Sequence, residues 1–188
     1  WSTDMSVEAL IKPAVIQAAD GTADLFRQGM RRLAGACTII TSHDPAKGRD
    51  GWAGMAATAV TSVTAEPPRL LVCINRSTWA HGVIGRSGVL GVNVLGDDGL
   101  AMMKRFSGGV PPEERIESSE WQGARTGAPL LGSALVAFDC AVAECVAAST
   151  HDIFICDVLD VLIRQSAEAP LIYFDGAFLG ERGDNRSN

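Results

Sequence analysis

Several signatures of familiar active sites are missing from this sequence. The chain has five cysteines without a CxxC pair and three histidines, none placed near a cysteine in a zinc pattern, so we expect no metal site. GxSxG and HExxH are absent, which argues against the common serine and zinc hydrolases. GxGxxG is absent too, so we expect any nicotinamide cofactor to bind outside a Rossmann fold.

The chain also has little that suits a membrane or a nucleic acid. The longest uncharged run, residues 51–65, is too short and too rich in Thr and Ser to span a bilayer. A formal net charge of −6 argues against a sequence-independent grip on nucleic acid. Residues 7–19 include charged residues and a proline and do not form the apolar core of a signal peptide. With four of the cysteines inside apolar runs, we expect reduced thiols and a cytoplasmic protein.

The remaining composition is that of one globular domain. Hydrophobic residues make up 47% of the 188 residues and charged residues 20%. Residues 1–22 show little pattern and are expected to form an arm, residues 23–182 the domain, and residues 183–188 a tail. Many short β-prone runs without regular β–α alternation predict a mainly β antiparallel barrel with flanking helices.

Local signals place the other elements of this domain. Helices are expected near residues 24–33 and 78–86, the second capped by Thr78, and a third is expected after a cap at Asp97 or Asp98. Residues 54–64 are one run of small and β-branched residues, which is typical of a strand. Residues 108–127 are polar and are expected to form a surface excursion, that is, a segment that leaves the core. Residues 134–146 and 153–163 predict two long strands that are apolar on both faces. Because a barrel core buries one face, a helix or a second subunit must cover the other.

Three segments are candidates for binding or catalysis, and each has an ordinary structural alternative. In residues 56–64 small side chains would let a planar ring approach the backbone, and Thr58, Thr61 and Ser62 would offer hydroxyls. A Thr-rich strand with one solvated face explains the same composition, and composition alone favours it. Residues 75–78 follow a strand and open a helix, which suits an anion, but a capped turn with a solvated arginine is an even alternative.

The third candidate segment is residues 149–152. His151 would position a nicotinamide or supply a proton, with Asp152 either orienting it or serving as a turn residue. A lone histidine in a turn is more often structural or solvated. His43 and His81 rank lower, and the charges at residues 113–115 are typical of a solvated loop.

Seven segments, taken in order, resemble the short-chain flavin reductases that supply two-component monooxygenases such as the 4-hydroxyphenylacetate and phenol hydroxylases. The resemblance covers residues 26–179, and any one segment alone is weak. The segments are Phe26-Arg27 with residues 30–34, residues 54–64, Pro67-Pro68 with residues 71–77, residues 92–95, residues 126–129, residues 150–155 and residues 170–174.

The resemblance implies a split β-barrel of the FMN-binding kind, assembled as a homodimer with flavin at the subunit interface. It also implies hydride transfer from NADH or NADPH to FMN or FAD, with reduced flavin passed to a partner monooxygenase. His151 is the implied catalytic residue, close to the nicotinamide. The implied cofactor-binding residues are Met55, Ala56, Ala57, Thr58, Ala59, Val60, Thr61, Ser62, Cys73, Asn75, Arg76, Ser77, Thr78, Phe106, Ser107, His151 and Tyr173.

Three positions depart from the family pattern. Ala56 stands where the family often has Thr, the triplet before Asp152 reads Ser149-Thr150-His151, and Phe178 replaces a frequent tyrosine. The alternatives to a reductase are a non-catalytic flavin carrier and another split-barrel flavoprotein oxidase. The basic phosphate-binding cluster expected of a pyridoxamine-phosphate oxidase is missing.

Overall fold

The computed structural model describes residues 21–108, 110–116, 119–165 and 168–179. The chain divides into two units, residues 1–33 and 34–188. In the first unit, α1 (Thr22–Met30) begins after Gly21, and none of its residues is buried. An ion pair between Asp24 and Arg27 joins successive turns of this helix. The helix ends three residues before Leu33, the last residue of the predicted helix.

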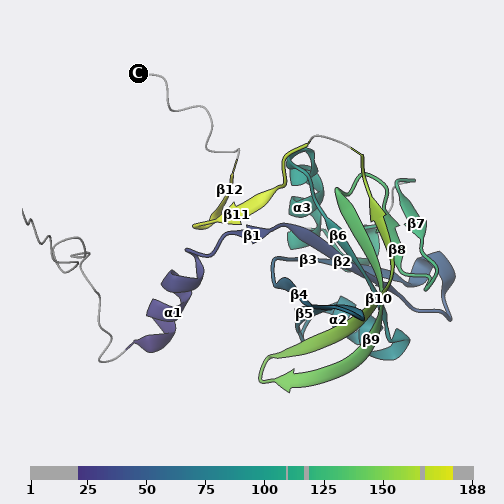
Figure 1. Ribbon diagram of the computed structural model, residues 1–188, viewed down its shortest axis with the longest axis horizontal. Helices are drawn as coiled ribbons and strands as arrows, with labels where there is room; N and C mark the ends of the chain where they lie inside the picture. The colour runs from purple at the N-terminus through teal and green to yellow at the C-terminus, as the bar shows by residue number, and fades with distance from the viewer. Residues whose placement is uncertain (1–20, 109, 117–118, 166–167, 180–188) are drawn as a thin grey trace, which may run out of the picture. The chain divides into compact units, whose positions relative to one another are not determined.

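The second unit is built on a seven-stranded sheet in which every neighbouring pair is antiparallel (Figure 1). This architecture confirms the prediction of a mainly β chain with flanking helices. In sheet order the strands are β3 (Trp52–Ala57), β2 (Thr38–His43), β6 (Val89–Val94), β9 (Val136–Ala148), β10 (His151–Ile163), β5 (Pro68–Asn75) and β4 (Val60–Ala65).

The two edge strands of this sheet are consecutive in the chain. Only Thr58 and Ala59 separate β3 from β4, so the sheet must curl until its opposite edges approach one another. Within the described residues no ladder pairs β3 with β4. The run predicted over residues 54–64 is therefore two strands, and the break between them lies where the sheet would have to close.

Short elements surround the large sheet. Among the described residues of this unit there are also two helices, three 3-10 turns and two small sheets, and every pairing in these sheets is antiparallel. The helices are α2 (Trp79–Ser87) and α3 (Leu100–Ser107), and the 3-10 turns are η2 (Gly48–Gly51), η3 (Asp97–Gly99) and η4 (Pro112–Glu114). The small sheets contain β1 (Gly35–Ala36), β11 (Ile172–Phe174) and β12 (Ala177–Phe178) in one and β7 (Trp121–Gly123) and β8 (Pro129–Leu131) in the other.

Two hydrophobic clusters lie on opposite faces of the sheet. Successive side chains of a strand point to opposite faces, and Ile39 and Ile40 of β2 accordingly enter different clusters. Ile39 packs with Phe106 of α3 and with Trp121, whereas Ile40 packs with strand residues such as Phe154. Burying each such side chain contributes roughly 1.5–3 kcal/mol to the free energy of folding. Packing on both faces therefore stabilises the sheet.

Three cysteines contribute to these clusters. Cys37, Cys140 and Cys156 have no exposed surface, and all five cysteines are free. Burial raises the pKa of Cys37 to about 11 and that of Cys156 to about 12, and it raises the pKa of Cys140 as well. These thiols are therefore protonated at neutral pH and behave as small apolar side chains.

The helix termini confirm one predicted cap and correct another. Thr78 is the N-cap of α2 and accepts a hydrogen bond from the backbone N–H of His81, as predicted. The prediction for α3 was wrong, because its N-cap is Gly99 and no side chain caps it. Asp97 and Asp98 instead belong to the 3-10 turn that precedes the helix.

The segment predicted as a polar surface excursion is partly structural. Residues 108–127 include η4 and β7, and Trp121 at the start of β7 is only 2% exposed. The Trp121 ring lies against Phe106, with 5.6 Å between the ring centroids. An aromatic anchor therefore ties this part of the chain to α3.

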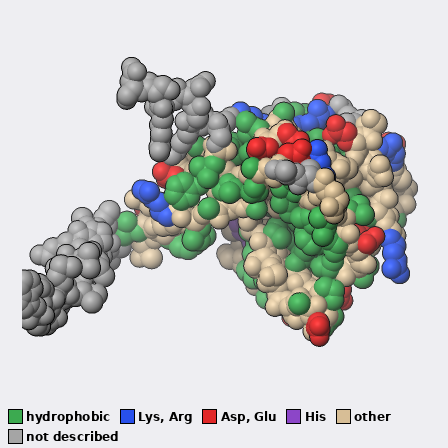
Figure 2. Space-filling model, turned by 45° about the horizontal axis from the view of Figure 1, so that its top comes forward, with side chains coloured by type: hydrophobic (Ala, Val, Ile, Leu, Met, Phe, Trp, Pro, Cys, Tyr) green, Lys and Arg blue, Asp and Glu red, His purple; other side chains and the backbone are tan. Residues whose placement is uncertain are grey.

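The two long predicted strands are confirmed as β9 and β10, each of 13 residues. Their apolar side chains are buried along only part of their length. Toward the ends of these strands, several large hydrophobic side chains are at least 40% exposed: Val146, Leu159, Val161, Leu162 and Ile163. In the space-filling view, hydrophobic side chains gather at the surface of this unit and charged groups lie mostly at its margin (Figure 2).

Candidate functional site

A cavity of about 650 Å³ opens beside the end of β3. It lies where β3, the N-terminus of α2, α3 and the β11–β12 hairpin meet. The residues that line it are Met55, Ala56, Ala57, Thr58, Thr78, Met103, Phe106, Ser107, Arg115, Tyr173, Gly176 and Phe178. Its size and its mixture of apolar and hydroxyl side chains are those of a small-molecule site.

The residues themselves explain why space remains here. Ala56 and Ala57 carry only methyl groups at the end of β3, so a flat molecule can lie against the backbone. Phe106 is 2% exposed and Met103 6%, which gives the cavity an apolar floor on α3. Tyr173 and Phe178 pack edge to face, with their ring centroids 5.3 Å apart, and form an aromatic wall. A planar aromatic ligand fits this combination of surfaces.

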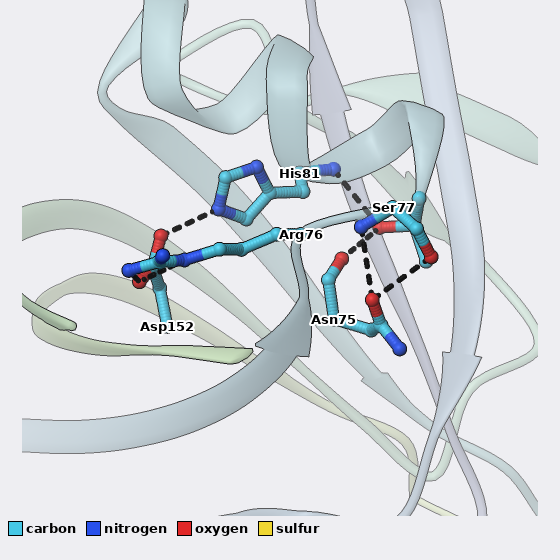
Figure 3. Close-up of polar contacts among 6 residues, drawn as sticks. Asn75, Arg76, Ser77, His81 and Asp152 are labelled. Atoms are coloured by element: carbon cyan, nitrogen blue, oxygen red, sulfur yellow. Dashed lines mark hydrogen bonds and ion pairs between the residues drawn. The ribbon is translucent and has the colours of Figure 1, made fainter. Parts of the chain in front are cut away.

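The loop before α2 presents few unused polar side chains. The Asn75 side-chain oxygen accepts hydrogen bonds from the Ser77 backbone N–H at 2.9 Å and the Ser77 hydroxyl at 2.8 Å (Figure 3). The Thr78 hydroxyl donates to the Asn75 carbonyl at 2.8 Å. Residues 75–78 thus form a capped turn, and within this loop only Thr78 lines the cavity.

A buried carboxylate lies beside the same loop. Asp152 is 7% exposed, and one of its oxygens accepts hydrogen bonds from Nε and Nη2 of Arg76 at 2.8 and 2.6 Å. Its other oxygen lies 2.7 Å from Nε2 of His81 (Figure 3). The Arg76 hydrogen bonds, followed by that of His81, hold the pKa of Asp152 below its ordinary value, although burial opposes this.

His151 lies apart from this network. It is exposed at the start of β10, and its Nδ1 lies 2.9 Å from the Thr150 hydroxyl. Neighbouring side chains on a strand point to opposite faces, so Asp152 points away from it. The interpretation that Asp152 orients His151 is therefore wrong, because Asp152 binds Arg76 and His81 instead.

The cavity brings together eight of the residues predicted to contact a cofactor: Met55, Ala56, Ala57, Thr58, Thr78, Phe106, Ser107 and Tyr173. Val60, Thr61 and Ser62 instead line a second cavity of about 620 Å³, whose walls include Phe138, Val158 and Val161. Ala59, Cys73, Asn75, Arg76, Ser77 and His151 line neither cavity.

Sequence reasoning missed the contacts of two polar side chains. Arg115 was assigned to a solvated loop, but it lines the cavity and donates a hydrogen bond to the Gly54 carbonyl at 3.3 Å. His81 ranked low, although it lies three residues after the Thr78 cap and reaches Asp152 across 71 positions of sequence. No local pattern signals either contact, because both depend on how distant segments meet.

A family model for the flavin reductase like domain matches residues 30–181. The chain belongs to the flavin reductase-like family. Among curated relatives, the FMN reductase (NADH) RutF of Stutzerimonas stutzeri is 44% identical over 82% of this chain and 86% of its own. The protein of the same name from Agrobacterium fabrum is 45% identical over 80% of this chain and 83% of its own.

Solved structures of flavin reductases share the fold. A putative flavin reductase from Haemophilus somnus superposes with a TM-score of 0.78 and 34% identity, covering 84% of this chain and 98% of that one. BorF, the flavin reductase component of a bacterial two-component tryptophan halogenase, has a TM-score of 0.74 and 29% identity, covering 83% and 96%. The fold of this flavin reductase family member is thus shared along most of the length of both structures.

The described part of the chain lacks two kinds of feature. No helix there has the length and apolar character needed to cross a membrane. No group of three or more His, Cys, Asp or Glu side chains in the same part of the chain is arranged to hold a metal ion.

The buried carboxylate gives a pH-dependent prediction. We expect Asp152→Asn to lower the Tm at neutral pH, because Arg76 and His81 lose their charged acceptor. A depressed folded-state pKa stabilises the fold above the ordinary pKa of 3.8, and this stabilisation disappears as pH falls through the lower folded value. The Tm difference between wild type and variant should therefore narrow in acid.

Thermal denaturation of both proteins between about pH 3 and 7 measures this difference. Asp157→Asn is the matched control, because the ion pair of Asp157 with Arg69 is about 40% exposed on both sides and should matter less. If the two substitutions lowered the Tm equally, or if the Tm difference between wild type and Asp152→Asn did not change with pH, the stabilising role of the Asp152 carboxylate would be contradicted.

Proposed function

We propose that this flavin reductase family member is an NADH-dependent FMN reductase. The observation that carries the proposal is the cavity at the end of β3, with small side chains, an aromatic wall and hydroxyl groups, in a chain of this family. The curated relatives at 41–45% identity are named FMN reductase (NADH), which favours FMN over FAD and NADH over NADPH.

The two nucleotides supply the redox chemistry in this proposal, as a hydride passes from nicotinamide C4 to flavin N5. The protein then has to align the two rings at about 3–3.5 Å and keep water away. Met55, Ala56 and Ala57 would support the flavin ring, and the hydroxyl of Thr58 would reach its polar edge or side chain. No side chain has to donate or accept a proton in the hydride step.

The direct test is an activity assay on the purified full chain. NADH or NADPH is mixed with FMN or FAD, and nicotinamide oxidation is followed by absorbance. We expect turnover, fastest with NADH and FMN. Absence of turnover with every pair would contradict the proposal and favour a flavin carrier, the alternative from a different functional class.

We further propose that the flavin is a substrate, which leaves once reduced and feeds a partner monooxygenase. The relationship to BorF, a component of a two-component system, supports this proposal. The cavity is also open to solvent on the described chain, as a site for an exchanging ligand requires. Stopped-flow measurements should show exchange of flavin in each cycle, and one permanently bound flavin would contradict it.

His151 is proposed to guide the nicotinamide ring. Its exposed imidazole is held near Thr150 and is free of the Asp152 network, so it can approach a second ligand. We expect His151→Ala to slow flavin reduction by about 100-fold, the lower end of the range for a positioned catalytic group, while flavin binding is kept. Equal loss of flavin affinity and reduction rate would make His151 a structural residue.

We propose a split β-barrel dimer as the working form. The curl of the sheet toward its two consecutive edge strands supports the split barrel, and the exposed apolar side chains of β9 and β10 support a second copy of the chain as their cover. Val161 is 40% exposed and also lines the second cavity, whose walls are largely apolar. Leu159, Val161, Leu162 and Ile163 are all exposed on one part of β10, and exposed apolar side chains gathered in this way mark an interface.

Val161→Asp tests the dimer by placing a charge on this surface. We expect a shift from dimer to monomer in light scattering after size exclusion, because the carboxylate would be desolvated in the interface. Ala101→Asp adds the same charge at an exposed position of α3 and should leave the mass unchanged. A monomeric wild type, or a dimeric Val161→Asp protein, would contradict the proposal.

A further inference from the structure

Arg115 is the one charged side chain among the described residues that line the cavity beside β3. It follows η4 directly, at the point where the chain returns toward α3 and β3. The chain as a whole carries a net charge of −6, so a cation facing the cavity stands out against the overall charge. Buried or half-buried arginine is usually matched by an anion.

The guanidinium of Arg115 is held in place by backbone carbonyls and not by carboxylates. Nε donates to the Val110 carbonyl at 3.2 Å, and Nη1 donates to the Gly54 carbonyl at 3.3 Å. These bonds use two of the five N–H donors of an arginine. Across the described residues no carboxylate forms an ion pair with Arg115, so its positive charge is not neutralised within the cavity wall.

A second arginine fixes the backbone on which Arg115 lies. Nε of Arg105, on α3, donates to the Arg115 carbonyl at 2.9 Å, and its Nη2 donates to the Glu114 carbonyl. The loop is thus attached to α3 through Arg105 and to β3 through Arg115. The guanidinium is preorganised, so little conformational freedom is lost when it binds a ligand.

The arginine before α2 is already neutralised. Arg76, which the sequence suggested for an anion, has its charge matched by Asp152 at 2.6 Å and does not line the cavity. The neighbouring hydroxyl of Thr78 is used in capping α2. Of the two arginines, Arg115 has the available charge and the available donors.

We propose that Arg115 binds the phosphate of the flavin substrate and makes the site selective for phosphorylated flavin over riboflavin. The inference rests on the proposed function and adds the group that recognises the side chain of the substrate. Gly54, whose carbonyl Arg115 contacts, directly precedes the residues proposed to support the flavin ring. Arg115 therefore lies on the flavin side of the cavity.

The test compares FMN with riboflavin, which lacks the phosphate and keeps the ring. Dissociation constants are measured by flavin fluorescence for the wild type and for Arg115→Gln. We expect the variant to bind FMN roughly 10- to 100-fold more weakly, the range for a lost charge-assisted hydrogen bond, and riboflavin unchanged. Arg115→Lys, which keeps the charge without the planar fork, should lie between the two.

Arg125→Gln is the matched control, because Arg125 is exposed and lies outside the cavity. Equal loss of FMN and riboflavin affinity would overturn the proposal, since Arg115 would then only shape the pocket. An increase in KM for NADH without a change in FMN affinity would also overturn it, because the arginine would then serve the nicotinamide nucleotide.

If Arg115→Gln is unstable, the flavin affinities of the wild type alone test the phosphate contact. FMN affinity should exceed riboflavin affinity and should decrease with added salt, whereas riboflavin affinity should not. Equal affinities would overturn the phosphate assignment even if the activity assay succeeds. A wild type that binds no flavin and shows no turnover would instead refute the proposed function itself.

Discussion

The structure depends on one constraint: the two edges of the large sheet are formed by strands that follow one another in the chain. Only Thr58 and Ala59 join β3 to β4, so the sheet has to curl, and its core forms on both faces of β2. The cavity lies beside this link, where the end of β3 carries alanines that leave room against the backbone. A flat sheet with the same strands would have neither the curl nor the cavity.

Charge pairing then decides which parts of the cavity rim can bind an anion. Asp152 is buried and must be hydrogen-bonded, and it takes Arg76 and His81 as its partners. The loop before α2 is thereby rigid and electrostatically matched. Within the described residues Arg115 has only neutral carbonyl partners, and it lines the cavity. The two arginines thus differ in the acceptors that the fold places beside them, a carboxylate for Arg76 and backbone carbonyls for Arg115.

The sequence was sufficient for features that depend on local patterns. The long β-prone runs gave β9 and β10, Thr78 was correctly placed as the cap of α2, and the ordered motifs led to the family. It was not sufficient where contacts join distant segments: the pairing of His81 with Asp152, the position of Arg115 and the anchoring of Trp121 against Phe106 all depend on tertiary packing. The acidic pair at residues 97–98 misled the prediction for α3, because a 3-10 turn competes with helix capping there.

Burial of the thiols affects how readily this protein is oxidised. Reduced flavin that meets dioxygen yields hydrogen peroxide, which attacks thiolates far faster than thiols. With a pKa of about 11, the Cys37 thiol is ionised in on the order of one molecule in ten thousand at pH 7, and Cys156 in fewer. Cysteine packed in the core of such a reductase is therefore protected from the oxidant that its own product can generate.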